Sequence, residues 1–378
     1  MKLTKAEVIL TKVPTRRPHK MTIGTTTTQD GVFLRLETDE GVSGWGEAPH
    51  MVGTSFAGET QLSVALQLRE RLLPAVLGKD PMDIEARQID MDRVLPRNPR
   101  AKSAVNIALY DIVGKALKVP AHRLLGGLVR DRVPLSWSIG SMPPEQGADE
   151  AKVMAEKGFG ILKLKVGARE RDQVDDDVEM AKRVRAAVGP KVRIRADANQ
   201  GFDVATAIRI TRGMEEHGLE SIEQPVGAAD LEGMAEVRRA VTCYVMADEG
   251  ANSPQDVYNV ARFRAADLIS IYINNGGGMT AAKKMAVVCE ATGLRGYMGG
   301  ALEGPIAARA CLHVAASSPS VSFGCEMVGP FLLTEDLGTE PIAFEGGALV
   351  VPTGPGLGGE LDEKKAKRFE IDRFSVPA

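Results

Sequence analysis

The sequence predicts an α/β protein, a (β/α)7β-type TIM barrel that carries an N-terminal α+β capping domain. Two observations lead to this prediction. From residue 134 onward, eight short β-rich runs alternate with helical stretches, and successive strand ends lie about twenty-five residues apart, roughly one βα unit. In the preceding third of the chain, strand-like runs come first and helical stretches follow, which is typical of an α+β unit.

The first part of the chain supplies the capping domain. Its strands are expected at residues 2–13, 31–38 and 41–48, with a turn signalled by Asp39-Glu40-Gly41. Its helices are expected at 58–76, 82–93 and 101–117, and the last of these shows clear apolar periodicity.

The barrel follows Gly126-Gly127 and Pro134, which indicate a break between regular elements. Its eight strands are expected at 134–140, 161–167, 192–199, 221–225, 244–249, 268–274, 294–298 and 321–326. We therefore place the capping domain at 1–128, the barrel at 129–345, and a C-terminal segment that returns to the capping domain at 346–378.

Composition excludes several classes of function. The net charge of −3 gives no basic field for a nucleic acid, and no apolar run is long enough to span a membrane. The N-terminus, M-K-L-T-K-A-E-V, is charged from the start and does not resemble a signal peptide. We expect a cytoplasmic protein, because the four cysteines lie far apart without a C-x-x-C pair: Cys243, Cys289, Cys311 and Cys325.

Charged residues stand at the ends of four consecutive predicted strands: Lys165, Asp197, Glu223 and Asp248, which are 32, 26 and 25 residues apart. Because the active site of such a barrel lies at the carboxyl ends of its strands, the three acids should converge there. Three neighbouring carboxylates repel one another unless a cation is bound. A ligand set made only of oxygens suits Mg²⁺, with Mn²⁺ as the alternative. Each acid alone would more often be a strand-end or helix-capping residue.

The run I-L-K-L-K-V-G at 161–167 would ordinarily be a half-exposed strand with its lysines in water. In a closed barrel alternate residues point inward, so Lys163 and Lys165 would share the interior with the acids. They would lie about 6.6 Å apart at strand spacing. Their repulsion, about 2–3 kcal/mol at an effective dielectric of about 20, would lower their pKa values. We expect Lys165 to act as the general base and Lys163 to tune it.

A base beside a metal that holds a carboxylate indicates one chemistry. It is the removal or delivery of a proton α to that carboxylate, through an enediolate whose charge the metal stabilises. The expected partner is therefore a small-molecule carboxylate.

Several motifs together resemble the enolase superfamily, and within it the muconate lactonizing enzyme subgroup. In the barrel these are K-L-K-V at 163–166, R-A-D-A-N at 195–199, I-E-Q-P at 222–225 and A-D-E at 247–249. Elsewhere they are G-W-G-E at 44–47, E-M-V-G-P-F-L-L-T-E-D at 326–336 and P-T-G-P-G-L-G at 352–358, so the resemblance covers nearly the whole chain.

The resemblance implies metal ligation by Asp197, Glu223 and Asp248 and acid/base catalysis by Lys165. It also implies positions beside the metal ligands or facing the substrate for Asn199, Glu249 and Glu326. Members of this family lean toward homo-oligomers, so a homo-oligomer is expected here.

One position departs from the subgroup, which carries a second lysine at the end of the sixth strand. That lysine lies six residues before the last glycine of a Gly-Gly pair, and counting back from Gly278 gives Tyr272. Tyrosine, with an ordinary pKa of about 10, is a poor general base but can donate a hydrogen bond or a proton. The mandelate racemase branch would place a histidine at the end of the seventh strand, and residues 293–304 contain none. We expect one-base chemistry through Lys165, with Tyr272 as a further catalytic residue.

Substrate specificity is expected from two mobile capping-domain loops, at 14–22 and 49–60. In the first loop, Arg16, Arg17, His19 and Lys20 are candidates to meet a second carboxylate, or else are solvated loop charges.

The sequence thus predicts a Mg²⁺-dependent enzyme most like a muconate-type cycloisomerase. Two alternatives keep the fold and the metal: a dehydratase of acid sugars or hydroxy acids, and an epimerase of dipeptides or N-acyl amino acids. A third is a metal-binding barrel that has lost catalysis together with the lysine of the sixth strand.

Overall fold

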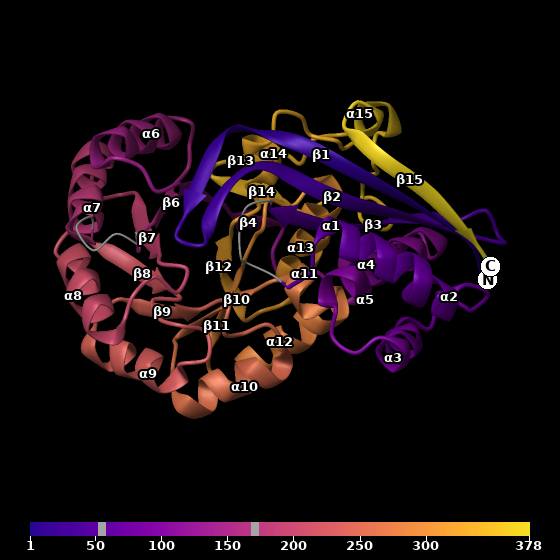
Figure 1. Cartoon of the computed structure of the whole chain (residues 1–378), viewed down its shortest axis with the longest axis horizontal. Helices are drawn as coiled ribbons and strands as arrows, with labels where there is room; N and C mark the ends of the chain where they lie inside the picture. The colour runs from indigo at the N-terminus through magenta and orange to yellow at the C-terminus, as the bar shows by residue number, and fades with distance from the viewer. Residues whose placement is uncertain (52–57, 168–173) are drawn as a thin grey trace.

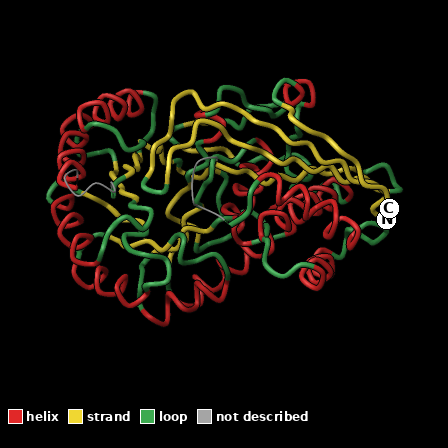
Figure 2. Tube along the Cα trace, in the orientation of Figure 1, coloured by secondary structure: helices red, strands yellow, loops and turns green. Residues whose placement is uncertain are grey.

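The computed structural model describes residues 1–51, 58–167 and 174–378. Within these residues, eight parallel strands form a nearly closed barrel, and an antiparallel sheet lies against it, which confirms the predicted fold class (Figure 1). Figure 2 shows the helices of the barrel as an arc outside its strands.

The antiparallel capping sheet has the strand order β15-β1-β2-β3. Its strands are β1 (Leu3–Met21), β2 (Gly24–Thr38), β3 (Ser43–Met51) and β15 (Glu370–Pro377). Alternate residues such as Val8 and Leu34 are fully buried in one apolar cluster with the capping helices. Their neighbours Ile9 and Phe33 are fully buried in the cluster that contains the barrel core, so both faces of the sheet are covered. Strand β15 was not predicted from the sequence. It pairs with β1 and so brings residues 370–377 back to this sheet.

Helices pack on the face of the capping sheet that carries Val8 and Leu34. They are α1 (Gln61–Gln67), the π-helical turn η1 (Leu68–Leu72), α2 (Leu73–Val76), α3 (Ile84–Val94) and α4 (Pro99–Ala116). Helix α4 approaches β3 closely because two residues of the G-W-G-E motif have no side chain. A Cβ at Gly46 would lie 1.8 Å from the carbonyl oxygen of Ala104, and a Cβ at Gly44 would lie 2.5 Å from that of Ala108.

Glu47, the last residue of that motif, joins the capping sheet to the barrel. Its buried carboxylate accepts the backbone N–H groups of Gly304, Ile306 and Ala307 at 2.6, 3.1 and 2.9 Å, where helix α13 (Pro305–Ser317) begins. Gln29 of β2 donates to the same carboxylate at 3.2 Å. A carboxylate is well placed at a helix N-terminus, where the unpaired N–H groups of the first turn need acceptors.

The barrel strands are β5 (Ser136–Ile139), β6 (Ile161–Lys165), β7 (Arg193–Asp197), β8 (Leu219–Glu223), β9 (Tyr244–Ala247), β10 (Leu268–Ile271), β11 (Arg295–Met298) and β12 (Val321–Cys325). Between them lie α6 (Pro144–Glu156), α7 (Val174–Val188), α8 (Val204–Glu215), α9 (Leu231–Ala240), α10 (Pro254–Phe263), α11 (Ile273–Gly276), α12 (Met279–Thr292) and α13.

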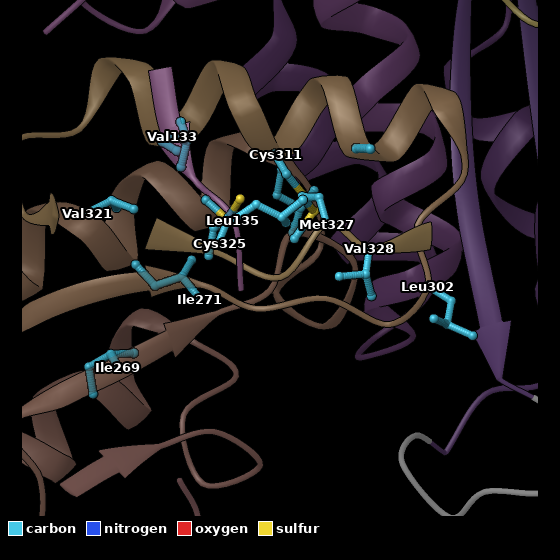
Figure 3. Packing of buried hydrophobic residues seen from close by; sticks show 14 of the residues in the cluster. Val133, Leu135, Ile269, Ile271, Leu302, Cys311, Val321, Cys325, Met327 and Val328 are labelled. Atoms are coloured by element: carbon cyan, nitrogen blue, oxygen red, sulfur yellow. The ribbon is translucent and has the colours of Figure 1, made fainter. Parts of the chain in front are cut away.

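A single parallel bridge between Leu135 and Cys325 joins the first and last barrel strands. Figure 3 shows Leu135, Cys325 and Met327 gathered beside Cys311 of α13 at this closure. Both cysteines are buried free thiols. The smaller elements are α5 (Ala121–Leu124), β4 (Arg132–Pro134), α14 (Gly329–Leu332), β13 (Phe344–Glu345), β14 (Ala348–Val350) and α15 (Glu363–Lys367).

The expectation of a loop at residues 14–22 is wrong, because β1 continues to Met21 and forms a long hairpin with β2. The hairpin is irregular in its middle. Pro14 pairs with Thr28 and His19 pairs with Thr26, so the chain advances five residues on β1 against two on β2. A proline cannot donate to a strand ladder, and an irregularity of this kind accommodates it. The tip beyond it reaches toward the ends of the barrel strands (Figure 1).

Replacing Gly46 with alanine should lower the free energy of unfolding by about 1–3 kcal/mol or more, because the new methyl group would overlap the carbonyl of Ala104. Urea unfolding followed by circular dichroism measures the change. Gly227→Ala is the matched control, since a Cβ there meets nothing within 4 Å. Equal losses in the two variants would contradict the close packing of α4 on β3.

Candidate active site

Four charged side chains stand at the carboxyl ends of four consecutive barrel strands. Lys165, Asp197 and Glu223 are the last residues of β6, β7 and β8, and Asp248 directly follows β9. In the strand register Lys165 pairs with Asp197, and Asp197 with Glu223, so all three lie at one level. All four side chains are buried. The barrel brings them together because parallel strands end at a common rim.

Lys163 lies one layer deeper, because it precedes Lys165 by two residues and shares the inward side of β6. Its Nζ lies 3.3 Å from the carboxylate of Asp197 and 3.0 Å from that of Glu223. It also contacts Glu326, which directly follows β12. Lys163 is therefore a buried cation enclosed by three carboxylates.

The carboxylates control the protonation of both lysines. Burial opposes the charge of Lys165 most strongly, but the carboxylate of Asp197 that it contacts, together with those of Glu326 and Glu223, outweighs burial, and its pKa lies above the usual value. Burial is likewise outweighed at Lys163, where Glu223, Glu326 and Asp197 raise the pKa well above the usual value. Lys163 does lower the pKa of Lys165, as expected from their repulsion, but the acids in contact with the two lysines outweigh this effect, so the expectation of a lowered pKa is wrong for both.

Three carboxylate oxygens in this group are buried without a hydrogen-bond partner among the described residues: Oε1 of Glu223 and both oxygens of Asp248. Burial raises the pKa of Glu223 to about 7. Burial and the neighbouring Glu249 raise the pKa of Asp248 well above its usual range. Because an unsatisfied buried polar atom costs about 1–3 kcal/mol, these oxygens call for a partner that a hard divalent cation would supply.

Asp197 is instead engaged with the lysines. Burial disfavours its charge, but Lys165 and Lys163 overcome this and hold its pKa at about 2. In the part of the chain that the structure describes, no three Asp, Glu, His or Cys side chains form a ready metal cage. The donor types thus fit a divalent ion, whereas the arrangement here is one of carboxylates paired with lysines.

A small pocket opens beside these residues. The barrel contributes Ser138, Lys165, Asn199, Tyr272 and Glu326 to its wall, and the β1–β2 hairpin contributes His19, Met21 and Ile23. Wider hollows of about 830 Å³ between α4 and α12 and about 560 Å³ beside α6 are lined neither by Lys165 nor by the strand-end acids. A hollow of about 290 Å³ beside Lys20 also reaches Lys165. The small pocket joins Lys165 to Asn199, Tyr272 and Glu326, so we take it as the place where a substrate would meet the charged cluster.

Tyr272 directly follows β10 and is buried in the wall of this pocket. Its hydroxyl donates a hydrogen bond to the carbonyl oxygen of Gly300 at 3.2 Å. Burial raises its pKa well above the usual value, and the surrounding acids, Asp248 foremost, raise it further. The side chain is thus a neutral phenol at neutral pH, which can donate a hydrogen bond but does not accept a proton.

Asn199 links two of the other predicted site residues. Its Oδ1 accepts a hydrogen bond from Lys165 at 3.2 Å, and its Nδ2 donates to Glu249 at 3.1 Å. Burial raises the pKa of Glu249, which faces Asp197. The asparagine therefore holds the amine of Lys165 on the side that faces the pocket.

The capping-domain candidates are divided. His19 lines the pocket, whereas Lys20 lines a neighbouring hollow that Lys165 also reaches. Arg16 turns away from both and donates to the carbonyl oxygens of Phe331 and Thr334 at 3.1 and 3.5 Å. Of the second predicted loop, Met51 belongs to β3 and lines the pocket, and residues 52–57 lie outside the described residues.

Sequence reasoning missed Ser138 and the apolar wall of the pocket. Ser138 pairs with Lys163 in the strand register. Because Lys163 was expected to point into the barrel, Ser138 on the neighbouring strand could have been predicted to point inward as well. Met21 and Ile23 were missed because the hairpin was taken for a loop, and Leu302 and Val328 because they follow strands in irregular segments.

No helix among the described residues has the length and the apolar character that crossing a membrane requires.

Residues 5–126 match the family described as mandelate racemase/muconate lactonizing enzyme, N-terminal domain, and residues 146–365 match the enolase C-terminal domain-like family. Muconate cycloisomerase 1 of Rhodococcus opacus is 34% identical over 372 residues, which cover 98% of each chain. The structure of muconate lactonizing enzyme from Pseudomonas fluorescens complexed with muconolactone is similar with a TM-score of 0.94 at 34% identity, covering 98% of this chain and 99% of the other. N-succinyl Arg/Lys racemase from Bacillus cereus has the same TM-score at 32% identity, over 100% of both chains.

Mg²⁺ should raise the melting temperature of metal-depleted protein, because it would satisfy the unpaired oxygens of Glu223 and Asp248. At a hundredfold excess over its dissociation constant, the ion should add about 2.7 kcal/mol of stability. Asp248→Asn should lose most of this increment, and the exposed Asp149→Asn should keep it. Differential scanning calorimetry with and without a chelator gives the measurement, and an increment that survives in Asp248→Asn would exclude this carboxylate as a ligand.

Proposed function

The chain belongs to the mandelate racemase/muconate lactonizing enzyme family of the enolase superfamily, and we propose that it is a cycloisomerase of the muconate type. Members of this family typically use a divalent metal ion. The reaction proposed here transfers a proton at the carbon α to a substrate carboxylate.

One observation carries the choice of reaction. Lys165 after β6 and Tyr272 after β10 line the same pocket, and their strands are four positions apart in the eight-stranded barrel, on opposite sides. Among the described residues of the pocket wall, Lys165 is the only amine. Because the raised pKa of Tyr272 opposes proton acceptance on the side opposite Lys165, the arrangement favours proton transfer on one face of the substrate, which suits the syn addition of a cycloisomerase.

The atoms balance when Lys165 regains its proton from water after each turnover. One carboxylate oxygen of an unsaturated dicarboxylate forms a C–O bond to a carbon of the conjugated double bond. The electron pair of that double bond moves toward the second carboxylate, and the carbon α to it takes a proton from Lys165. The product is an isomer of the substrate, and the reverse reaction returns the proton to Lys165.

The residues have distinct roles in this proposal. Lys165, whose pKa lies above its usual value, carries the proton that lactonisation consumes. Asn199 orients the amine of Lys165. Tyr272 donates a hydrogen bond on the opposite wall and excludes water. Asp197, Glu223 and Asp248 would hold Mg²⁺ or Mn²⁺, which supplies positive charge next to the substrate carboxylate.

The structural similarity to N-succinyl Arg/Lys racemase supports a second candidate, the racemisation of an N-acyl amino acid. A racemase needs a proton acceptor on each face of the α carbon. Tyr272 stands where the second acceptor would be, and its raised pKa opposes that role. Dehydration of a hydroxy acid would need only the face that Lys165 serves.

The wild-type enzyme with Mg²⁺ should convert cis,cis-muconate to a lactone of the same mass and, in D₂O, place one deuterium on one face of the α carbon. Lys165→Ala should lower kcat/KM by about 10²–10⁴-fold because the proton donor is gone. Tyr272→Phe should lower it by less than about tenfold, since only a hydrogen bond is lost. Mass spectrometry and proton NMR measure the product, and the exposed Lys182→Ala is the control.

The same assay on N-acyl amino acids, dipeptides and hydroxy acids separates the alternatives. Racemisation of an N-acyl amino acid that Tyr272→Phe abolishes would overturn the one-base proposal. Loss of water would show as a lower product mass and would indicate a dehydratase. No turnover of any substrate by protein shown to bind Mg²⁺ would favour a barrel without catalysis.

A further inference from the structure

The hairpin of the capping sheet brings one histidine into the pocket. His19 lies just beyond the irregular step in the pairing of β1 with β2, is only 3% exposed, and lines the same wall as Lys165 and Tyr272. Its Nδ1 lies 3.1 Å from Nη1 of Arg17, two residues earlier on the same strand.

This contact fixes the protonation of the ring. A guanidinium group has only donors, so Nδ1 of His19 must accept the hydrogen bond and cannot carry a proton itself. The ring is then neutral, and its single N–H lies at Nε2. Burial, together with the positive charges of Lys165 and Arg17, also lowers the pKa of His19 well below its usual value.

Arg17 is itself held in place by the barrel. Its Nη2 donates to Glu150 of α6 at 2.6 Å and to the carbonyl oxygen of Ser138 on β5 at 3.0 Å. The indole N–H of Trp137 donates to the same oxygen of Glu150 at 2.7 Å. The orientation of His19 is thus set by a chain of contacts that begins outside the pocket.

The Nε2–H group of His19 is weakly engaged in the pocket. Its nearest partner is the hydroxyl of Ser138 at 3.4 Å, which is longer than an ordinary N–H···O hydrogen bond. Apolar side chains such as Met21 and Ile23 form the wall around it. A donor that is oriented, buried and only weakly satisfied is suited to an oxygen of a ligand.

We propose that His19, oriented by Arg17, is the subsite for an oxygen acceptor at the end of the substrate remote from the reacting carboxylate, above all for a second carboxylate. His19 touches the substrate through Nε2–H, and Arg17 is a positioning residue. The subsite rests on the proposed function, because it identifies which carboxylates that active site accepts.

The first test is the tautomer of His19 in the Mg²⁺-loaded protein. Long-range proton–nitrogen NMR of protein with labelled histidine distinguishes the two tautomers, and His19→Gln identifies the signal among the five histidines. The expected result is a proton on Nε2 in the wild type and a mixture of tautomers in Arg17→Met. A proton on Nδ1 in the wild type would overturn the proposal.

The second test is binding of two probes, adipate and hexanoate, which differ in the remote carboxylate. With Mg²⁺ present, adipate should bind about tenfold more tightly to the wild type, as expected for one hydrogen bond to a charged group. The ratio should fall below about threefold in His19→Phe and Arg17→Met. It should persist in His19→Gln, whose amide can donate from the same position.

Arg16→Met is the matched control, because the neighbouring arginine donates to backbone carbonyls away from the pocket and the variant should keep the wild-type ratio. The binding test separates this inference from the proposed function. A ratio near one in the wild type would reject the subsite even if muconate were converted. A tenfold ratio in a protein that converts no substrate would support the subsite and reject the cycloisomerase.

Discussion

The arrangement of side chains at the carboxyl ends of the barrel strands depends on an excess of buried carboxylates over amines. Among the described residues, five carboxylates gather there against two amines: Asp197, Glu223, Asp248, Glu249 and Glu326 against Lys163 and Lys165. Like charges repel far more strongly in such an environment than in water, so protons or a cation must balance the surplus. The raised pKa values of Glu223 and Asp248 identify where the surplus lies. A divalent ion held by these carboxylates would balance the same surplus.

The barrel does not complete the pocket alone, because the capping helix α4 holds the turn that follows Tyr272. Arg100 donates to Asn275 at 2.9 Å, Ser103 donates to Asn274 at 2.9 Å, and Asn106 donates to Thr280 at 3.0 Å. These three α4 residues are spaced three apart and therefore lie along one face of the helix. Together with Glu47 at the start of α13, they fix the cap on the barrel, so a hairpin built into the cap can set the shape of a site whose chemistry belongs to the barrel.

The fold class was predictable from the sequence because the barrel repeats one pattern eight times, and the placement of Lys165, Asp197 and Glu223 followed from their positions at the ends of consecutive strands. The roles of these residues remain proposals. The pKa of Lys165 was not predictable, since the acids that enclose the two lysines include Glu326, which lies more than 160 positions away in the sequence. The path of residues 14–22 was missed because prolines and basic residues are typical of loops, whereas here the pairing simply steps over them.

That step has a consequence for how the family can change its substrates. Between Pro14 and His19 the two strands of the hairpin are out of step, while the pairing on either side is regular. A residue gained or lost within the step would rotate or shift the side chains beyond it and leave the sheet before it intact. Small insertions and deletions at this one place can therefore remodel the side of the pocket that the hairpin forms, without altering the strand ends that carry Lys165 and the acids.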